Sequence, residues 1–181
     1  MTPTLTAYPP GRSPQATTPG DIVLTHRHRK IMPTAISFAQ RLAFRGPERP
    51  YAHWSHAALI VSTTGTLVEA LSGGVRQTNL TERYLEREFH VISTGASPQD
   101  RGQTVAYAIS TLGQRYSWWA DASLLLGLLT GLKIGLAVGG QQFCSGSVAR
   151  AIDGRPRFID PEPARCLPGH LAKHYAVLEA A

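Results

Sequence analysis

The chain is poor in cysteine, in lysine and in charged side chains generally. Two cysteines among 181 residues are too few for the disulfide framework of a small secreted domain. Charged residues make up only 17% of the chain. No apolar run of signal-peptide length lies near the N-terminus, so we expect no export signal, which leaves the cytoplasm or delivery by another route open. The length suits one domain with a core of its own.

The net charge of +6 comes almost wholly from arginine. The arginines are scattered, and no aromatic and basic cluster or nucleic-acid motif accompanies them, so we expect a solvated basic surface and no nucleic-acid partner. His26 and His28 have a spacing that metal ligands can use. No carboxylate or cysteine lies close to them in the sequence, so we expect a solvated loop, no metal site and no cofactor.

The N-terminal segment differs in composition from the rest. Residues 1–19 are rich in proline and threonine and almost lack large apolar residues, which predicts a disordered leader. A first strand is predicted at 20–24, after a glycine turn, and an amphipathic helix at 31–44. The folded domain is therefore expected to span 20–181.

A hairpin is the best-defined element of the sequence. Two strands are predicted at 54–62 and 66–71, joined by a turn at 63–65. Both are apolar on both faces, which is typical of a covered strand pair at the centre of a sheet. Two polar side chains interrupt this pattern, His56 at the start of one strand and Glu69 inside the other.

The length of the turn fixes which residues lie opposite one another. A two-residue loop at 63–64 pairs Ile60 with Leu67, which makes His56 and Glu69 diagonal neighbours on one face, about 7 Å apart at the backbone. A carboxylate there could orient the imidazole and stabilise its protonated form, as the third member of a catalytic triad does. The alternative is a satisfied histidine at the sheet end and a glutamate with a local capping role. A slip of one residue would place the pair on opposite faces.

The second chemical feature is Cys144. Apolar residues recur along one helical stripe of 141–152, so Cys144 is expected on the first turn of a buried helix. Unpaired N–H groups and the helix dipole there would stabilise a thiolate and could hold an oxyanion. The alternative is a small apolar core residue. Together with His56 and Glu69, the cysteine favours Cys–His–acid chemistry.

A leucine-rich stretch at 122–138 carries glycines at every fourth position, Gly127, Gly131 and Gly135. Such a stripe allows another helix to approach closely. We expect a buried helix or helical hairpin that covers the sheet. The alternatives are a wall for a lipid or acyl chain and a helix that touches a membrane. A membrane span is disfavoured, because the run is short and contains Lys133.

The remaining elements follow from shorter patterns, and Cys166 is expected to be structural or borne on a loop. The predicted elements are a turn and strand at 73–78, a short charged helix at 80–88, strands at 89–93 and 175–178, and a helix at 100–112.

Taken together, these motifs resemble the circularly permuted NlpC-like cysteine peptidases and amidases of the papain fold. The resemblance covers about 20–154, with five short motifs in the expected order. The matching segments are 20–24, 55–61, 67–70, 73–76 and 143–151, with Tyr116 in a loop before the last. It implies an α+β, papain-like fold in which a central antiparallel sheet packs against the cysteine-bearing helix. In unpermuted relatives that helix precedes the sheet, whereas here the order is His, Glu, Cys.

The resemblance also implies roles for individual residues. Cys144 corresponds to the nucleophile, His56 to the general base and Glu69 to the orienting acid. Tyr116 and Ser145 are weaker candidates for the oxyanion or substrate side. The chain departs from the family pattern at residue 146, a glycine where permuted members often have glutamate, and this leaves the subgroup and its substrate open.

The implied reaction is cleavage of an amide bond, in a peptide or in peptidoglycan, through a thioester. The first alternative is a lipid or acyl amidase, or an acyltransferase, that uses the same residues. In that case 122–138 would contact the acyl chain or a membrane. The second alternative is a structural or binding domain that retains the fold without catalysis.

Overall fold

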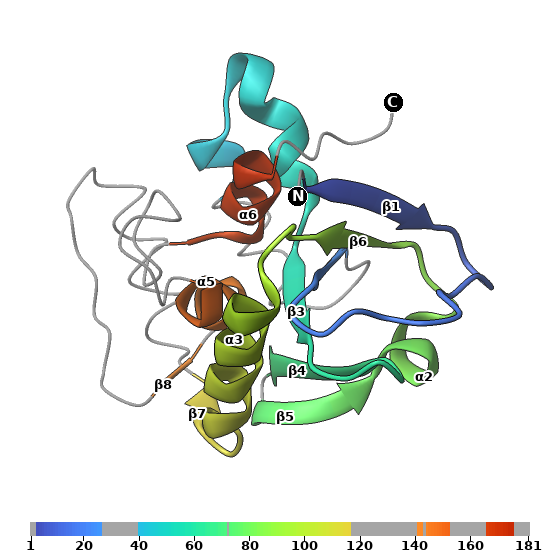
Figure 1. Cartoon of the computed structure of the whole chain (residues 1–181). Coiled ribbons are helices and arrows are strands. Elements are labelled where there is room, and N and C mark those ends of the chain that lie inside the picture. The colour runs from blue at the N-terminus through green and yellow to red at the C-terminus, as the bar shows by residue number, and fades with distance from the viewer. Residues whose placement is uncertain are drawn as a thin grey trace.

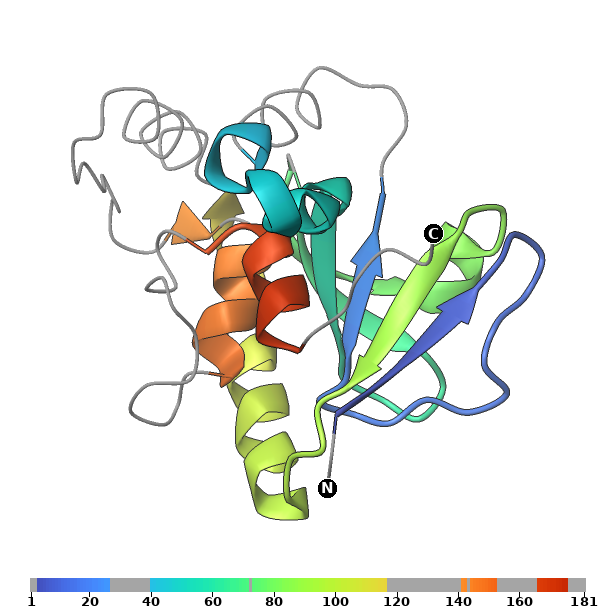
Figure 2. The same cartoon turned by 90° about the horizontal axis from the view of Figure 1, so that it is seen from above.

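The computed structural model describes residues 3–26, 40–71, 73–116, 141–142, 144–152 and 166–175. Within them, six strands form an antiparallel sheet in the order β1-β6-β2-β3-β4-β5. Helices α3, α5 and α6 cover one face, and the short helix α2 lies on the other side (Figures 1 and 2). The fold is therefore α+β, as expected. The strands are β1 (Thr4–Tyr8), β2 (Ile22–Thr25), β3 (His56–Ile60), β4 (Thr66–Leu71), β5 (Gly74–Asn79) and β6 (Phe89–Ser93).

The central strands β2 and β3 are buried along their whole length. Their side chains alternate between two apolar clusters, as strand geometry requires. Ala57 and Leu59 of β3 belong to the cluster under α5, whereas Ala58 and Ile60 belong to the cluster on the side of α2. Strand β4 is likewise buried from Leu67 to Leu71, with Val68 and Ala70 in the first cluster and Leu67 in the second. The predicted strand pair, β3 and β4, is therefore covered on both faces.

The predicted hairpin register is confirmed at its closing end. Ile60 lies opposite Leu67, and the backbone N–H of Val61 donates to the carbonyl of Thr66 at 2.8 Å. Gly65 closes the turn at φ +83°, a conformation that side chains with a Cβ rarely adopt. The turn length therefore sets which β3 and β4 side chains share a face.

Residues 4–8, which composition placed in a disordered leader, instead form the edge strand β1. It pairs with β6 along its whole length, from Thr4 opposite Ser93 to Tyr8 opposite Phe89. Most of β1 is exposed, but the Tyr8 ring stacks on Phe89 with centroids 5.1 Å apart. Backbone pairing and one aromatic contact order this strand. Amino-acid composition indicates how much of a segment can be buried, but it carries no information on backbone pairing with another strand.

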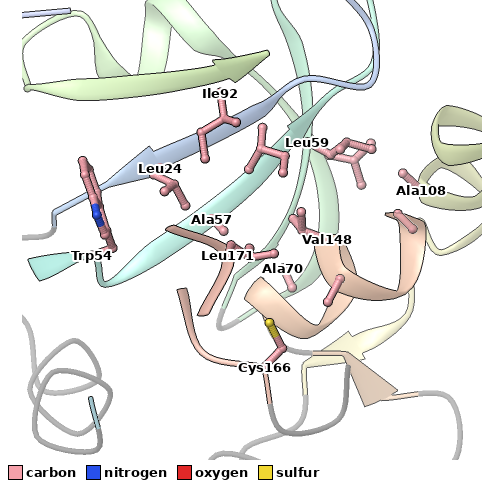
Figure 3. Close-up of a cluster of buried hydrophobic side chains, with 14 of the residues drawn as sticks. Leu24, Trp54, Ala57, Leu59, Ala70, Ile92, Ala108, Val148, Cys166 and Leu171 are labelled. Atoms are coloured by element: carbon pink, nitrogen blue, oxygen red, sulfur yellow. The ribbon is translucent and has the colours of Figure 1, made fainter. Parts of the chain in front are cut away.

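Small and branched side chains pack the helices against the sheet. Helix α3 (Pro98–Ser110) begins at Ser97, whose hydroxyl accepts from the N–H of Asp100, close to the predicted 100–112. Helix α5 (Cys144–Ile152) buries Val148 and Ala149 against the sheet. Figure 3 shows Val148 beside Ala57, Leu59 and Ala70, with Cys166 and Leu171 next to them.

The C-terminal part of the chain contains a helix that the sequence analysis did not predict. Residues Pro168–His174 form helix α6, while most of the predicted strand at 175–178 lies outside the described residues. Helix α6 packs against the 3-10 helix η1 (Gly46–His53). Gly169 permits this approach, because a Cβ there would lie 2.5 Å from the carbonyl oxygen of Tyr51. The periodic pattern of this segment is too short to reveal a helix that tertiary packing stabilises.

Two predictions cannot be compared with the structure. Most of the helix predicted at 31–44 lies outside the described residues. The structure describes only its last part, where residues 40–43 are helical. The stretch 122–138 lies entirely outside them. Among the helices that are described, none has the length and apolar character needed to cross a membrane.

Candidate active site

The polar pair predicted from the hairpin forms in the structure. His56 Nε2 lies 2.7 Å from Glu69 Oε2. Both residues are buried, and the Glu69 side chain is fully shielded from solvent. A carboxylate without solvent needs compensating donors, because desolvation of an unpaired charge costs several kcal/mol. The environment of Glu69 must therefore supply them.

Three more side chains supply those contacts, and each oxygen of Glu69 receives two. The Tyr84 hydroxyl donates to Oε2 at 2.7 Å, beside His56. The Thr78 hydroxyl donates to Oε1 at 2.6 Å, and Arg83 Nε forms an ion pair with the same oxygen at 2.7 Å, without the geometry of a hydrogen bond. The carboxylate is held in one orientation by groups from three different elements.

These contacts decide the charge of Glu69. Burial by itself would raise its pKa, but the hydrogen bond and positive charge of His56, with the hydroxyls of Thr78 and Tyr84, outweigh burial and lower the pKa to about 2. Burial and the Glu69 charge together raise the pKa of Tyr84, so its hydroxyl keeps its proton and acts as a donor. An ionised Glu69 can only accept hydrogen bonds, so His56 Nε2 must carry a hydrogen.

Local sequence explains how the partners reach Glu69. Strand β5 ends at Asn79, whose side-chain oxygen accepts from the N–H groups of Thr81 and Glu82 and caps helix α2 (Leu80–Tyr84). The helix thus begins directly after the strand that pairs with β4, and its last turn brings Arg83 and Tyr84 over the carboxylate. Sequence reasoning missed both residues. The available signal was a short charged helix that follows the strand next to the acid.

The pair does not lie on the face that α5 covers. By strand alternation, His56 shares the side of Ala58 and Ile60, and Glu69 contacts α2 on that side. Helix α5 packs on the opposite face, with Ala57. His56 is, however, the first residue of β3, so it lies at the end of the sheet.

A series of strand contacts links the end of β4 to the start of α5. Strand β4 pairs with β3 at the closing end of the hairpin, where Leu59 lies opposite Val68, and Leu71 at the other end of β4 pairs with Gly74 of β5. Val75 is joined to the segment before β7 (Arg115–Tyr116), since its N–H donates to the Gln114 carbonyl at 2.9 Å. Strand β7 pairs in parallel with β8 (Gln141–Gln142), which leads directly into α5. Figure 1 shows β7 and β8 beside the end of β4 and the start of β5.

The structure places the other candidate residues as follows. Cys144 is the first residue of α5, which confirms the predicted helix start. Tyr116 ends β7, opposite Gln142. Ser145 is 1% exposed, and its hydroxyl donates to the carbonyl of Cys166 at 2.6 Å. That hydroxyl therefore ties α5 to the segment before α6, and Cys166 lies fully buried in the core.

The predicted histidine loop lies partly outside the described residues, which include His26 but not His28. His26 stacks on His53 with ring centroids 4.4 Å apart, and its Nδ1 contacts the His53 carbonyl. Within the described part of the chain, no three histidine, cysteine or acidic side chains gather closely enough to bind a metal ion.

No protein-family model matches the sequence, and no curated protein matches it either.

Proposed function

We propose that the chain is a cysteine hydrolase of the permuted papain-like type, with Cys144 as nucleophile, His56 as general base and acid, and Glu69 as the orienting residue. The observation that carries the proposal is the buried His56–Glu69 pair, 2.7 Å apart, in a chain whose helix α5 begins at Cys144. The pair lies on the face of the sheet opposite α5, so the mechanism requires Cys144 and His56 to meet around the edge of the sheet. The resemblance of the sequence motifs agrees with this assignment.

The tautomer follows from the charge of Glu69. Because Nε2 of His56 donates to Glu69, Nδ1 is the nitrogen that takes the thiol proton in the neutral ring. The Cys144 thiolate then attacks the carbonyl carbon of an amide and forms a tetrahedral oxyanion. Backbone N–H groups at the first turn of α5 would stabilise that oxyanion. Collapse breaks the C–N bond, and His56 gives its proton to the leaving amine.

A thioester on Cys144 remains after the amine leaves. His56, again neutral, removes a proton from a water molecule that attacks the thioester carbonyl. The second tetrahedral intermediate collapses to a carboxylic acid and restores the thiolate and the protonated imidazole. An amine or alcohol in place of water would give acyl transfer by the same steps.

The direct test of the nucleophile is alkylation by iodoacetamide followed across pH. A thiolate stabilised by His56 and the helix start reacts well below about pH 8.5, the ordinary range of a cysteine thiol. We expect Cys144 to be labelled rapidly near neutral pH, and His56→Ala to move its profile towards the ordinary range. Cys166, buried in the core, serves as the internal reference. An ordinary pH profile for Cys144, or one unchanged in His56→Ala, would refute the assignment.

The substrate class is a separate question. A panel of muropeptides and of amides or esters with rising acyl length distinguishes a peptidase or peptidoglycan amidase from a lipid amidase or acyltransferase. We expect turnover of peptide-type amides. A specificity that rises with acyl length, and that Leu128→Ser or Leu132→Ser flattens, would favour the lipid alternative instead, because each buried methylene contributes about 0.8 kcal/mol. Rapid alkylation without turnover of any substrate would favour a binding domain.

A further inference from the structure

The two oxygens of Glu69 serve two different bases. Oε2 lies 2.7 Å from His56 Nε2, and Oε1 lies 2.7 Å from Arg83 Nε. One negative charge is therefore divided between a guanidinium, which is always charged, and an imidazole, which can gain or lose its proton.

The three groups differ in their exposure to solvent. The Glu69 side chain is 0% exposed and that of His56 is 6% exposed, whereas that of Arg83 is 25% exposed. Charges within a few ångströms interact strongly where water is excluded, and partial exposure weakens the interaction without abolishing it. By this rule the Arg83 charge would act on His56 across the carboxylate that both residues contact.

We infer that Arg83 is a positioning residue that shares Glu69 with His56 and thereby lowers the pH at which His56 gives up its proton. Repulsion between the guanidinium and the imidazolium disfavours the protonated ring, while the Glu69 charge favours it. Arg83 thus limits the stabilisation that Glu69 provides. The effect of Arg83 on proton binding by His56 is inferred from the contacts alone. The effect of Arg83 on turnover rests on the proposed function.

Other titratable or charged groups that face the pair come from the elements around it. Helix α2 adds Tyr84, which keeps its proton and stays neutral. Strand β5 presents Arg76, directly opposite Glu69 but exposed to solvent, where its charge is screened. The neighbouring strand β2 presents the neutral Thr25 opposite His56. Among these described neighbours, Arg83 is the cation in contact with the shared carboxylate.

The experiment is an NMR titration of the His56 ring in a Cys144→Ala background, which removes the thiol and makes the readout independent of catalysis. In Arg83→Gln we expect the midpoint of the titration to rise by on the order of half a pH unit. Arg83→Lys, which keeps the charge, should return the midpoint close to that of the parent. Arg87→Gln, at an exposed arginine just beyond α2, removes one positive charge elsewhere and should leave the midpoint unchanged.

An unchanged or lowered midpoint in Arg83→Gln, or an equal rise in Arg87→Gln, overturns the inference. Because Arg83 is partly exposed, we expect its variants to fold. If Arg83→Gln fails to fold, the titration of Arg83→Lys, which keeps the charge, tests the inference instead. A His56 midpoint in Arg83→Lys that differs from that of the parent by half a pH unit or more also overturns the inference. In the enzyme with Cys144 intact, the basic limb of kcat/KM should move to higher pH in Arg83→Gln. Ordinary Cys144 reactivity with a raised midpoint would refute the hydrolase and leave this inference standing.

Discussion

The described part of the chain contains two pairs of histidine and glutamate whose side chains lie at similar distances but differ in chemistry. His56 lies 2.7 Å from Glu69, and His90 lies 3.0 Å from Glu88. Both imidazoles are buried, but the Glu69 side chain is 0% exposed and that of Glu88 is 63% exposed. The difference lies in the carboxylate and not in the histidine.

Exposure decides what each carboxylate can do for its histidine. The Glu88 carboxylate lies largely in water, where hydration and screening weaken its interaction with the histidine. His90 packs edge-on against Trp54, with ring centroids 4.6 Å apart, and its Nδ1 has no hydrogen-bond partner among the described residues. Glu69 is fixed by contacts from β3, β5 and α2. Only a carboxylate held in this way keeps an imidazole in one tautomer and one orientation, as catalysis demands.

The largest expected effect is on turnover. Glu69→Gln keeps the size of the side chain but removes the charge that orients His56, so we expect kcat/KM to fall by about 10²- to 10⁴-fold. Glu88→Gln, the matched change in the exposed pair, should alter it by less than about twofold. Steady-state kinetics on any substrate that the enzyme turns over provides the measurement. Equal losses in the two variants would show that burial does not separate the pairs.

The next effect is on stability at low pH. The pKa of Glu69 in the folded chain is about 2, below its ordinary value of 4.5. Its contribution is therefore fully present above about pH 5 and is lost as the pH falls through about 2. From this shift we expect a contribution on the order of 3 kcal/mol to the free energy of unfolding. Urea denaturation at a series of pH values measures it.

Two variants serve as controls for the acid-stability measurement. Glu69→Gln should lose most of this pH dependence, because it has no carboxylate to protonate. Glu88→Gln should keep the profile of the parent chain. If the Glu69→Gln profile parallels that of the parent, other carboxylates cause the acid loss.

A smaller effect tests the network around Glu69. Tyr84→Phe removes the hydroxyl that donates to Oε2 and keeps a ring whose tilted contact with Phe89 has centroids 6.4 Å apart. Loss of a buried hydrogen bond to a charged group predicts a decrease of about 1.5–3 kcal/mol in the free energy of unfolding. Tyr8→Phe, in a partly exposed ring on the same Phe89, should change it by less than about 0.5 kcal/mol. Equal effects would assign the role of Tyr84 to its ring.

The smallest effect is expected at the exposed pair. Glu88→Gln should change the free energy of unfolding at pH 7 by less than about 0.5 kcal/mol, and added salt should not alter that difference measurably. Thermal or urea unfolding at low and high salt provides the test. A loss above about 1.5 kcal/mol would mean that Glu88 is organised like Glu69, which its exposure contradicts.

Particular residues show which parts of the fold and of the candidate site can be predicted from the sequence. The two-residue turn was enough to place His56 beside Glu69, because side chains alternate along a strand and one pair fixes all others. The apolar stripe after Cys144 was enough to predict that a helix begins there. Strand β1 and helix α6 were missed, since edge pairing orders the first and packing against η1 stabilises the second. Neither cause leaves a periodic pattern in a short segment.

The sequence by itself thus determined the hairpin, its register, the shared face of His56 and Glu69, and the position of Cys144 at a helix start. These are local properties, fixed by the spacing of residues within one or two elements. Tertiary structure alone decided that Arg83 and Tyr84 contact Glu69, and that α5 packs on the face of the sheet opposite the His56–Glu69 pair. Such contacts join side chains whose separation in the chain says nothing of their distance in space. The charge of Glu69 depends on them, because burial and its donors act in opposite directions on the carboxylate.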